Sequence, residues 1–167
     1  MKKIAIIGSG GAGKSTFARQ ISNKLNIEVY HLDAILWKPN WVATSKHEQQ
    51  EIQRNLVAKE SWIIDGNYGG TLDIRVNAAD TVIFLDIHRV ICVYRAIKRV
   101  LRYRNKTRPD MREGCEEKFD LDFLKWIWDY PKEKRPSILK MLDEVSKEKN
   151  VIILCSPKEV GYFIGNL

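Results

Sequence analysis

Residues 2–16 read KKIAIIGSGGAGKST, and this stretch decides the fold. The apolar run at residues 4–7 predicts a buried strand, and the glycines that follow it predict a sharp turn. Residues 8–15 match the pattern G-x-x-x-x-G-K-[ST] at every fixed position. Residues 14–25 then carry apolar side chains at helical spacing. A strand, a glycine-rich turn and a helix in this order predict a phosphate-binding P-loop.

Each part of this loop has a physical task. Glycines let the backbone turn and present its N–H groups to phosphate oxygens, and the start of the helix adds a partial positive charge. Lys14 is expected to bridge the β- and γ-phosphates of ATP, and the Ser15 hydroxyl is expected to bind Mg²⁺. The expected nucleotide-binding residues are Gly8, Gly10, Gly11, Ala12, Gly13, Lys14, Ser15 and Thr16.

The rest of the chain alternates strands with helices. Helices are expected near residues 44–60, 90–101 and 121–145, the last with a break near Pro131 and Pro136. Further strands are expected at residues 27–31, 61–64, 81–85 and 151–154. This alternation predicts an α/β protein with a parallel sheet between two layers of helices, built as one domain over residues 1–167. Ligands of such sheets bind at the carboxyl ends of the strands.

Acidic residues follow three of these expected strands. Asp33 could accept the proton of an acceptor hydroxyl or position Mg²⁺ through water, and Asp65 is an alternative metal-binding acid. Both acids could instead cap the turns that follow their strands. For Asp86 a structural role is favoured, because Arg89 is a ready local partner. Trp37, Trp41 and Tyr68 could wall an acceptor pocket, although core packing is common for aromatic residues.

The basic residues are concentrated in one segment. The net charge of the chain is +7, and residues 89–112 hold nine basic residues against one acid, so the remainder is nearly neutral. Within this segment Val90, Tyr94, Ile97 and Leu101 have the spacing of an amphipathic helix, and Arg95, Arg99 and Arg102 share another face. We expect an arginine-rich lid at about residues 103–119, and we expect Arg99, Arg104 and Arg108 to stabilise a transferring phosphoryl group. A solvated basic face is the alternative.

Other protein classes fit the sequence poorly. A GTPase needs an N-K-x-D motif, and the nearest match, residues 105–108, ends in arginine instead of aspartate. The three cysteines are far apart and match no zinc or disulfide pattern, which favours reduced thiols in the cytoplasm. No apolar run approaches the ~18 residues of a membrane span, so no membrane partner is expected.

The ordered motifs resemble the family of DNA topology modulation proteins (FlaR-like), small relatives of adenylate kinase and other nucleotide kinases. The resemblance covers nearly the whole chain and rests on the P-loop together with the stretches 31–33, 62–68, 71–75, 79–86 and 108–112. It implies a P-loop kinase fold with sheet order 2-3-1-4-5 and an arginine-bearing lid. Where adenylate kinases continue Asp-Gly with Phe-Pro-Arg, this chain has Asn67-Tyr68-Gly69, which argues against an AMP-type acceptor.

Three functions remain open from the sequence. The favoured one is an ATP-dependent kinase that acts on a nucleoside, a nucleotide or a similar small acceptor. The second is a nucleotide-regulated protein that binds DNA through residues 89–112. The third is a P-loop switch that hydrolyses ATP slowly or only binds it.

Overall fold

The computed structural model describes residues 1–167 and is built on a five-stranded parallel sheet. The sheet order is β2-β5-β1-β6-β7, which in chain order is 2-3-1-4-5 and confirms the expected topology. The strands are β1 (Lys3–Gly8), β2 (Val29–His31), β5 (Trp62–Asp65), β6 (Thr81–Leu85) and β7 (Asn150–Leu154). Strands β1, β5 and β6 are almost wholly buried, as their β-branched, continuously apolar sequences predict for a sheet covered on both faces.

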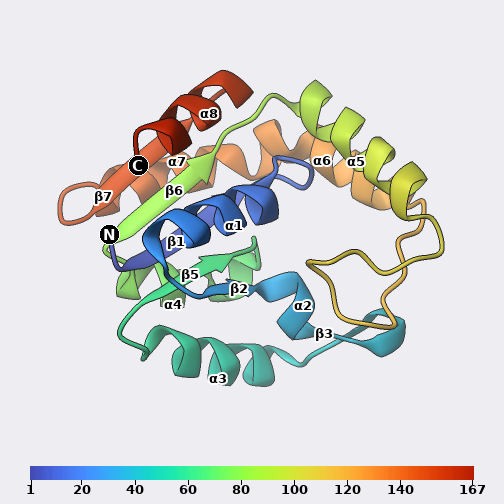
Figure 1. The fold of residues 1–167 in the computed structure, drawn as a ribbon, viewed down its shortest axis with the longest axis horizontal. Coiled ribbons are helices and arrows are strands. Elements are labelled where there is room, and N and C mark those ends of the chain that lie inside the picture. Colours follow the sequence, from blue (N-terminus) through green and yellow to red (C-terminus); the bar gives the residue numbers. More distant parts are fainter.

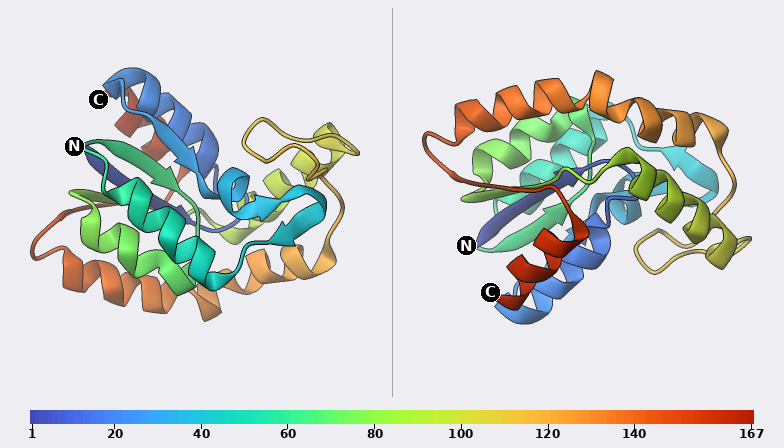
Figure 2. Two further views of the ribbon diagram at one scale, coloured as in Figure 1. Left: turned by 90° about the horizontal axis from the view of Figure 1, so that it is seen from below. Right: turned by 90° about the horizontal axis from the view of Figure 1, so that it is seen from above.

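Helices cover both faces of the sheet and make three layers (Figures 1 and 2). One face is covered by α1 (Lys14–Leu25) and α8 (Pro157–Gly165), and the other by α3 (Lys46–Val57), α4 (Leu72–Ala78) and α7 (Arg135–Val145). The side chains of the strands alternate between two cores. Ile4, Ile6 and Ile83 belong to the core under α1, whereas Ala5, Ile7 and Val82 belong to the core under α4.

Two further helices pack against each other beside the P-loop. They are α5 (Arg89–Tyr103) and α6 (Leu121–Glu133), and the segment that connects them, residues 104–120, holds no regular helix or strand. The expected break in the last long helix falls at Lys134, between α6 and α7. Pro131 lies inside α6, and Pro136 lies in the first turn of α7, where a missing N–H costs little.

The region between β2 and α3 differs from the sequence expectation, which placed no element there. A short helix α2 (Leu32–Leu36) follows β2 directly, and a small hairpin pairs β3 (Trp37–Lys38) with β4 (Val42–Ala43). The Ser45 side chain then caps α3 in a capping box with Glu48.

The apolar stripe that identified α5 faces solvent. Tyr94 is 62% exposed and Leu101 72% exposed, and Val90 and Ile97 are exposed beside them. The residues of α5 that enter the core are Cys92 and Ala96, whose small side chains allow close approach to the P-loop. The spacing therefore predicted the helix correctly but not the face that packs. No helix of the chain combines the length and the apolar character needed to cross a membrane.

Candidate active site

The register of the sheet brings the ends of three strands together. In the parallel ladders Ile6 of β1 is paired with Asp65 of β5, and Asp65 is paired with His31 of β2. Gly8, two residues after Ile6, begins the P-loop. The loop, Asp65 and His31 therefore meet at one carboxyl edge, where parallel sheets bind their ligands.

The P-loop owes its shape to residues without side chains. Gly8, Gly11 and Gly13 have φ values of 149°, 73° and 96°, which side chains disfavour. Lys14 folds back over the loop and donates from Nζ to the carbonyl oxygens of Gly8 and Ser9, each at 2.9 Å. Burial lowers the pKa of Lys14, although the charges of Asp33 and Asp65 oppose this shift.

A chain of polar contacts links the loop to the neighbouring strands. The Ser15 hydroxyl donates to Asp65 Oδ2 at 2.9 Å, and Asp65 Oδ1 lies 2.5 Å from His31 Nδ1. Burial by itself lowers the pKa of His31, but the hydrogen bond and the charge of Asp65 outweigh it, so the pKa of His31 is raised above 6.5. Asp65 is buried beside Ser15, and its role as a metal ligand stays a prediction.

This pair of groups fits a magnesium ion that arrives with the nucleotide. Ser15 offers a hydroxyl oxygen and Asp65 a carboxylate oxygen, and Mg²⁺ prefers hard oxygen ligands. No group of three His, Cys, Asp or Glu side chains forms a closed metal cage in the protein. Mg²⁺ sites that use one or two carboxylates are completed by waters and substrate phosphates.

Arg75 fixes the turn that follows Asp65. Its side chain is fully buried and donates to the carbonyl oxygens of Gly66 at 3.2 Å and Asn67 at 2.7 Å, and it also contacts Gln53. Burial lowers the pKa of Arg75 to about 10. The Asn67 side chain in turn accepts the amide N–H of Gly8 at 3.4 Å, so this turn braces the start of the P-loop.

Asp33 lies across the site from the P-loop, in α2. The hydroxyl of Tyr68 donates to Asp33 Oδ1 at 2.9 Å, and Arg108 donates to Asp33 Oδ2 at 3.3 Å. The Asp33 side chain keeps 45% of its surface exposed, so it is accessible to a small molecule. Burial and the neighbouring charge of Asp33 raise the pKa of Tyr68 well above 10, which keeps Tyr68 a hydrogen-bond donor.

The segment 104–120 folds over the site and touches the β3–β4 hairpin. The amide of Asn40 donates to the Gly114 carbonyl at 3.0 Å, and Trp41 Nε1 donates to the Glu116 carbonyl at 3.0 Å. The buried thiol of Cys115 reaches the Lys38 carbonyl at 3.2 Å. Trp37 and Trp41 pack edge to face in this hairpin, with ring centroids 5.6 Å apart. The hairpin, which follows the helix of Asp33, and the segment therefore hold each other in place.

Arg108 is the most enclosed basic residue of this segment. It is 6% exposed and lies near three carboxylates: Asp33 at 3.3 Å, Asp110 at 3.6 Å and Glu117 at 3.6 Å. Asp110 lies close to Ser15 of the P-loop. Burial opposes ionisation of Asp110, but the charge of Arg108 and the nearby Ser15 side chain hold its pKa below the ordinary value.

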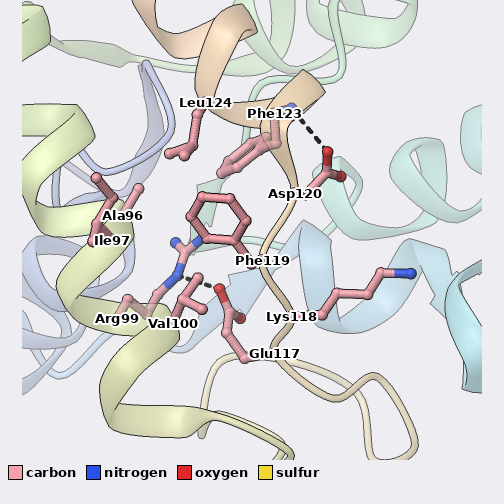
Figure 3. A pocket seen from close by; sticks show the side chains of 10 residues that line it. All are labelled: Ala96, Ile97, Arg99, Val100, Glu117, Lys118, Phe119, Asp120, Phe123 and Leu124. Carbon is pink, nitrogen blue, oxygen red and sulfur yellow. Dashed lines mark hydrogen bonds and ion pairs between the residues drawn. The ribbon is translucent and has the colours of Figure 1, made fainter.

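Arg99 reaches the same network from α5. Its Nε donates to Glu117 Oε1 at 2.8 Å, and its guanidinium lies over the Phe123 ring at 5.7 Å from the centroid. Figure 3 shows Arg99 and Val100 of α5 facing Glu117, Phe119 and Phe123 around a cavity of about 20 Å³, which is enough for about one water molecule. Arg99 and Arg108 thus converge through Glu117.

The remaining arginines of the basic segment have different environments. Arg95 donates to the Ala12 carbonyl at 3.1 Å and so supports the P-loop. Arg102 and Arg104 are exposed, and the Arg104 side chain makes no hydrogen bond or ion pair within the protein. A catalytic role for Arg104 stays a prediction. Thr16, the last expected nucleotide ligand, is exposed at the start of α1.

The prediction that Asp86 pairs with Arg89 is wrong. Asp86 binds Arg135 of α7, which donates from Nε to both carboxylate oxygens at 2.9 Å. Arg89 instead stacks on Trp128, with its guanidinium 4.2 Å from the ring centroid. Arg135 lies 49 residues from Asp86 in the chain, so spacing within one helix could not identify it. The pair joins the end of β6 to α7 and supports a structural role.

Three polar residues of the site were missed as functional residues by the sequence analysis. His31 stood in a noted motif without a role, and Asp110 was counted only as the single acid of the basic segment. Glu117 lay at the end of a polar loop among other acids. The only sequence signal for Asp110 and Glu117 is that they are carboxylates close to arginines. Such a signal does not distinguish a buried carboxylate that pairs with an arginine from an exposed carboxylate in water.

The close packing of Gly11 gives a first testable prediction. A methyl group at Gly11 would lie 2.1 Å from the Cys92 carbonyl oxygen, and the positive φ of 73° disfavours any side chain. We expect Gly11→Ala to lower the free energy of unfolding by at least about 2 kcal/mol, because α5 must move away from the loop. Urea unfolding measures this loss. Gly69→Ala is the matched control, since its methyl group meets nothing within 4 Å. Equal stability of the two variants would contradict the packing described here.

Comparison with solved structures places this site on a known architecture. Over 98% of this chain and 94% of the other, the structure matches shikimate kinase from Bacteroides thetaiotaomicron with a TM-score of 0.59 and 16% identity. Shikimate kinase from Acinetobacter baumannii, in complex with shikimate, matches over 99% and 90% with a TM-score of 0.63 and 13% identity. The fold is that of the P-loop kinases. At such identities the likeness establishes the three-layer fold and the sheet.

A sugar kinase from a Janibacter species has the same architecture, with a TM-score of 0.55, 14% identity and coverage of 99% of this chain and 93% of the other. No family model matches the sequence, and no curated protein matches it. Membership in the DNA topology modulation family therefore stays a prediction.

Proposed function

We propose that the protein is an ATP-dependent phosphotransferase that moves the γ-phosphoryl group of ATP to a small acceptor. The observation that carries this proposal is the closeness of Asp33 to Lys14, where the charge of Asp33 opposes the lowering of the Lys14 pKa by burial. Arg108 contacts Asp33 directly and pairs with Asp110, which lies close to Ser15 of the loop. An acceptor bound at Asp33 therefore lies near the phosphates on the loop.

The residues divide the work of an in-line transfer. The P-loop amides and Lys14 bind the β- and γ-phosphates, and Ser15 and Asp65 would hold Mg²⁺, which would neutralise charge on these phosphates. Asp33 accepts the proton of an acceptor hydroxyl as the acceptor oxygen bonds to the γ-phosphorus. The bond between that phosphorus and the β–γ bridging oxygen breaks, and ADP leaves.

Arginines and the folded segment complete the proposed mechanism. Arg99 and Arg108 stabilise the negative charge on the oxygens of the transferring group, as arginines do in phosphoryl transfer. In this scheme residues 104–120 form the lid that the basic sequence predicted. The lid excludes water, which would otherwise take the phosphoryl group in place of the acceptor. Its contacts with the β3–β4 hairpin make it a cover for both substrates.

Transfer to a panel of acceptors tests the proposal. The protein is incubated with γ-labelled ATP and Mg²⁺ and with nucleosides, nucleotides, sugars or shikimate, the last two included because of the names of the similar structures. We expect labelled phosphate on one acceptor class and ADP in equal amount. Tight ATP binding without transfer to any member of the panel would contradict the proposal. ATP hydrolysis that no acceptor accelerates would favour the nucleotide switch.

Binding to DNA is the second candidate function, and the exposed cations favour it. Arg102, Arg104 and Arg112 are exposed and make no ion pair in the protein. If they bind DNA phosphates, affinity for duplex DNA falls steeply as salt rises and drops further when the three become alanine. Binding that is weak and insensitive to salt would exclude this function.

A further inference from the structure

One buried carboxylate near the site has no part in the proposed transfer. Glu117 is 5% exposed, whereas the other glutamates of the segment, Glu113 and Glu116, are exposed. Buried carboxylates are rare unless they are paired, because the charge must give up its hydration. Glu117 is paired twice. Its Oε1 accepts Arg99 Nε at 2.8 Å, and its Oε2 lies 3.6 Å from an Arg108 guanidinium nitrogen.

Without this carboxylate, the positive charges of Arg99 and Arg108 would repel each other. Burial lowers the pKa of Arg99, the nearby charge of Arg108 lowers it further, and Glu117 opposes both effects. The two guanidiniums come from separate elements, since Arg99 belongs to α5 and Arg108 to the lid. Like charges at short range in a poorly hydrated site separate when they can. The negative charge of Glu117, which pairs with both guanidiniums, offsets this repulsion.

The backbone of Glu117 fixes where this carboxylate stands. Its amide donates to the Lys106 carbonyl at 3.0 Å, and its carbonyl accepts the amide of Asn105 at 3.4 Å. These bonds, with the bridge between Arg104 and Glu117, close the base of the lid. Because both ends of the lid meet at this residue, the carboxylate holds its place relative to α5 (Figure 3).

We propose that Glu117 is a positioning residue, which holds Arg99 and Arg108 together above the P-loop so that both reach the γ-phosphate of bound ATP. This inference rests on the proposed function, and it adds a residue that touches neither ATP nor the acceptor. Glu117 acts only through the two arginines. In this arrangement the guanidiniums of Arg99 from α5 and Arg108 from the lid act as a pair.

A double-mutant cycle tests this role. Glu117→Gln keeps the shape of the side chain and removes its charge. We expect it to lower kcat about tenfold to a hundredfold, which is less than the loss of a direct donor because both arginines remain, with the KM of the acceptor unchanged within about twofold. In an Arg99→Gln/Arg108→Gln background the same change should alter kcat by less than about twofold. A shorter carboxylate, Glu117→Asp, should recover part of the loss.

Nucleotide binding provides a readout that does not need transfer. If both arginines face the γ-phosphate, the protein binds a non-hydrolysable ATP analogue more tightly than ADP, and Glu117→Gln reduces that preference about tenfold. Glu113→Gln, an exposed glutamate of the same lid, should change neither affinity nor kcat. Thermal unfolding of each variant checks that it is folded. Should Glu117→Gln fail to fold, the cycle is run with Glu117→Asp.

The outcomes separate this inference from the proposed function. An equal loss in the wild-type and the double-arginine backgrounds would overturn the positioning role, because Glu117 would then act independently of the arginines. If the wild-type protein phosphorylates no acceptor but prefers the ATP analogue, and if Glu117→Gln reduces that preference only while Arg99 and Arg108 are present, the proposed function is overturned and the role of Glu117 is supported. A protein that binds neither nucleotide would overturn both.

Discussion

Replacement of Lys14 by methionine is expected to lower the rate of phosphoryl transfer by about a thousandfold. Lys14 Nζ stands over the P-loop, and the charges of Asp33 and Asp65 act on it. Removing one preorganised donor from a developing phosphate charge costs about 10²–10³ in kcat, and Lys14 also carries a full charge. The measurement is the initial rate of phosphoryl transfer from labelled ATP to the acceptor that the panel of candidate acceptors identifies.

The fold should survive this replacement. The Lys14 side chain is half-buried, methionine fills nearly the same space, and the lost bonds run only to two carbonyl oxygens of the loop. Thermal unfolding of Lys14→Met should therefore resemble that of the wild type. Lys24→Met, at an exposed site in the last turn of the same helix α1, is the matched control and should keep full activity. Turnover by Lys14→Met within tenfold of the wild type would show that Lys14 does not act on the phosphates.

Replacement of Asp33 by asparagine should have the second large effect, about a hundredfold to a thousandfold on kcat. The amide keeps an oxygen for either Tyr68 or Arg108, so α2 and the lid stay in place. It cannot accept a proton from an acceptor hydroxyl, and a positioned base contributes about 10²–10⁴ to such reactions. Because Asp33 lies on the acceptor side, the KM of ATP should change by less than about threefold.

Basal hydrolysis distinguishes a base from a structural carboxylate. In Asp33→Asn, slow ATP hydrolysis in the absence of acceptor should persist at the wild-type rate, since the P-loop groups are untouched. Loss of both activities together would show that Asp33 supports the nucleotide site instead. Asp143→Asn, an exposed acid in α7 whose side chain makes no hydrogen bond, serves as the control and should leave both rates unchanged.

The P-loop and the acids at the strand ends were predictable from the sequence, whereas the residues that contact those acids were not. The P-loop was predicted residue by residue, because its glycines, lysine and serine are contiguous and each has a fixed geometric task. Asp65 and Asp33 were predicted from their places after strands, because parallel strands end at one edge. Their partners were not predictable. The Tyr68–Asp33 bond spans 35 residues and the Arg108–Asp33 bond spans 75, and no periodicity connects them.

The helix α5 shows where pattern reasoning fails. Val90, Tyr94, Ile97 and Leu101 form a proper helical stripe, and apolar burial usually turns such a stripe inward. Here the inner face of α5 packs against the P-loop backbone, and only small side chains fit on that face. Gly11 approaches the Cys92 carbonyl so closely that no bulky side chain could pass between the helix and the loop. Backbone contact with the loop thus overrides the preference for burying large side chains.

By itself the sequence determined the glycine-rich loop, the alternation of strands and helices and the concentration of charge in one segment. These features depend on residue spacing, on the stiffness or freedom of the backbone and on net charge, all of which are properties of neighbours in the chain. Tertiary structure alone decided which charges of the basic segment turn inward. Arg99 and Arg108 are enclosed because Glu117, Asp33 and Asp110 offset their desolvation, whereas Arg102 and Arg104 have no such partners and stay in water.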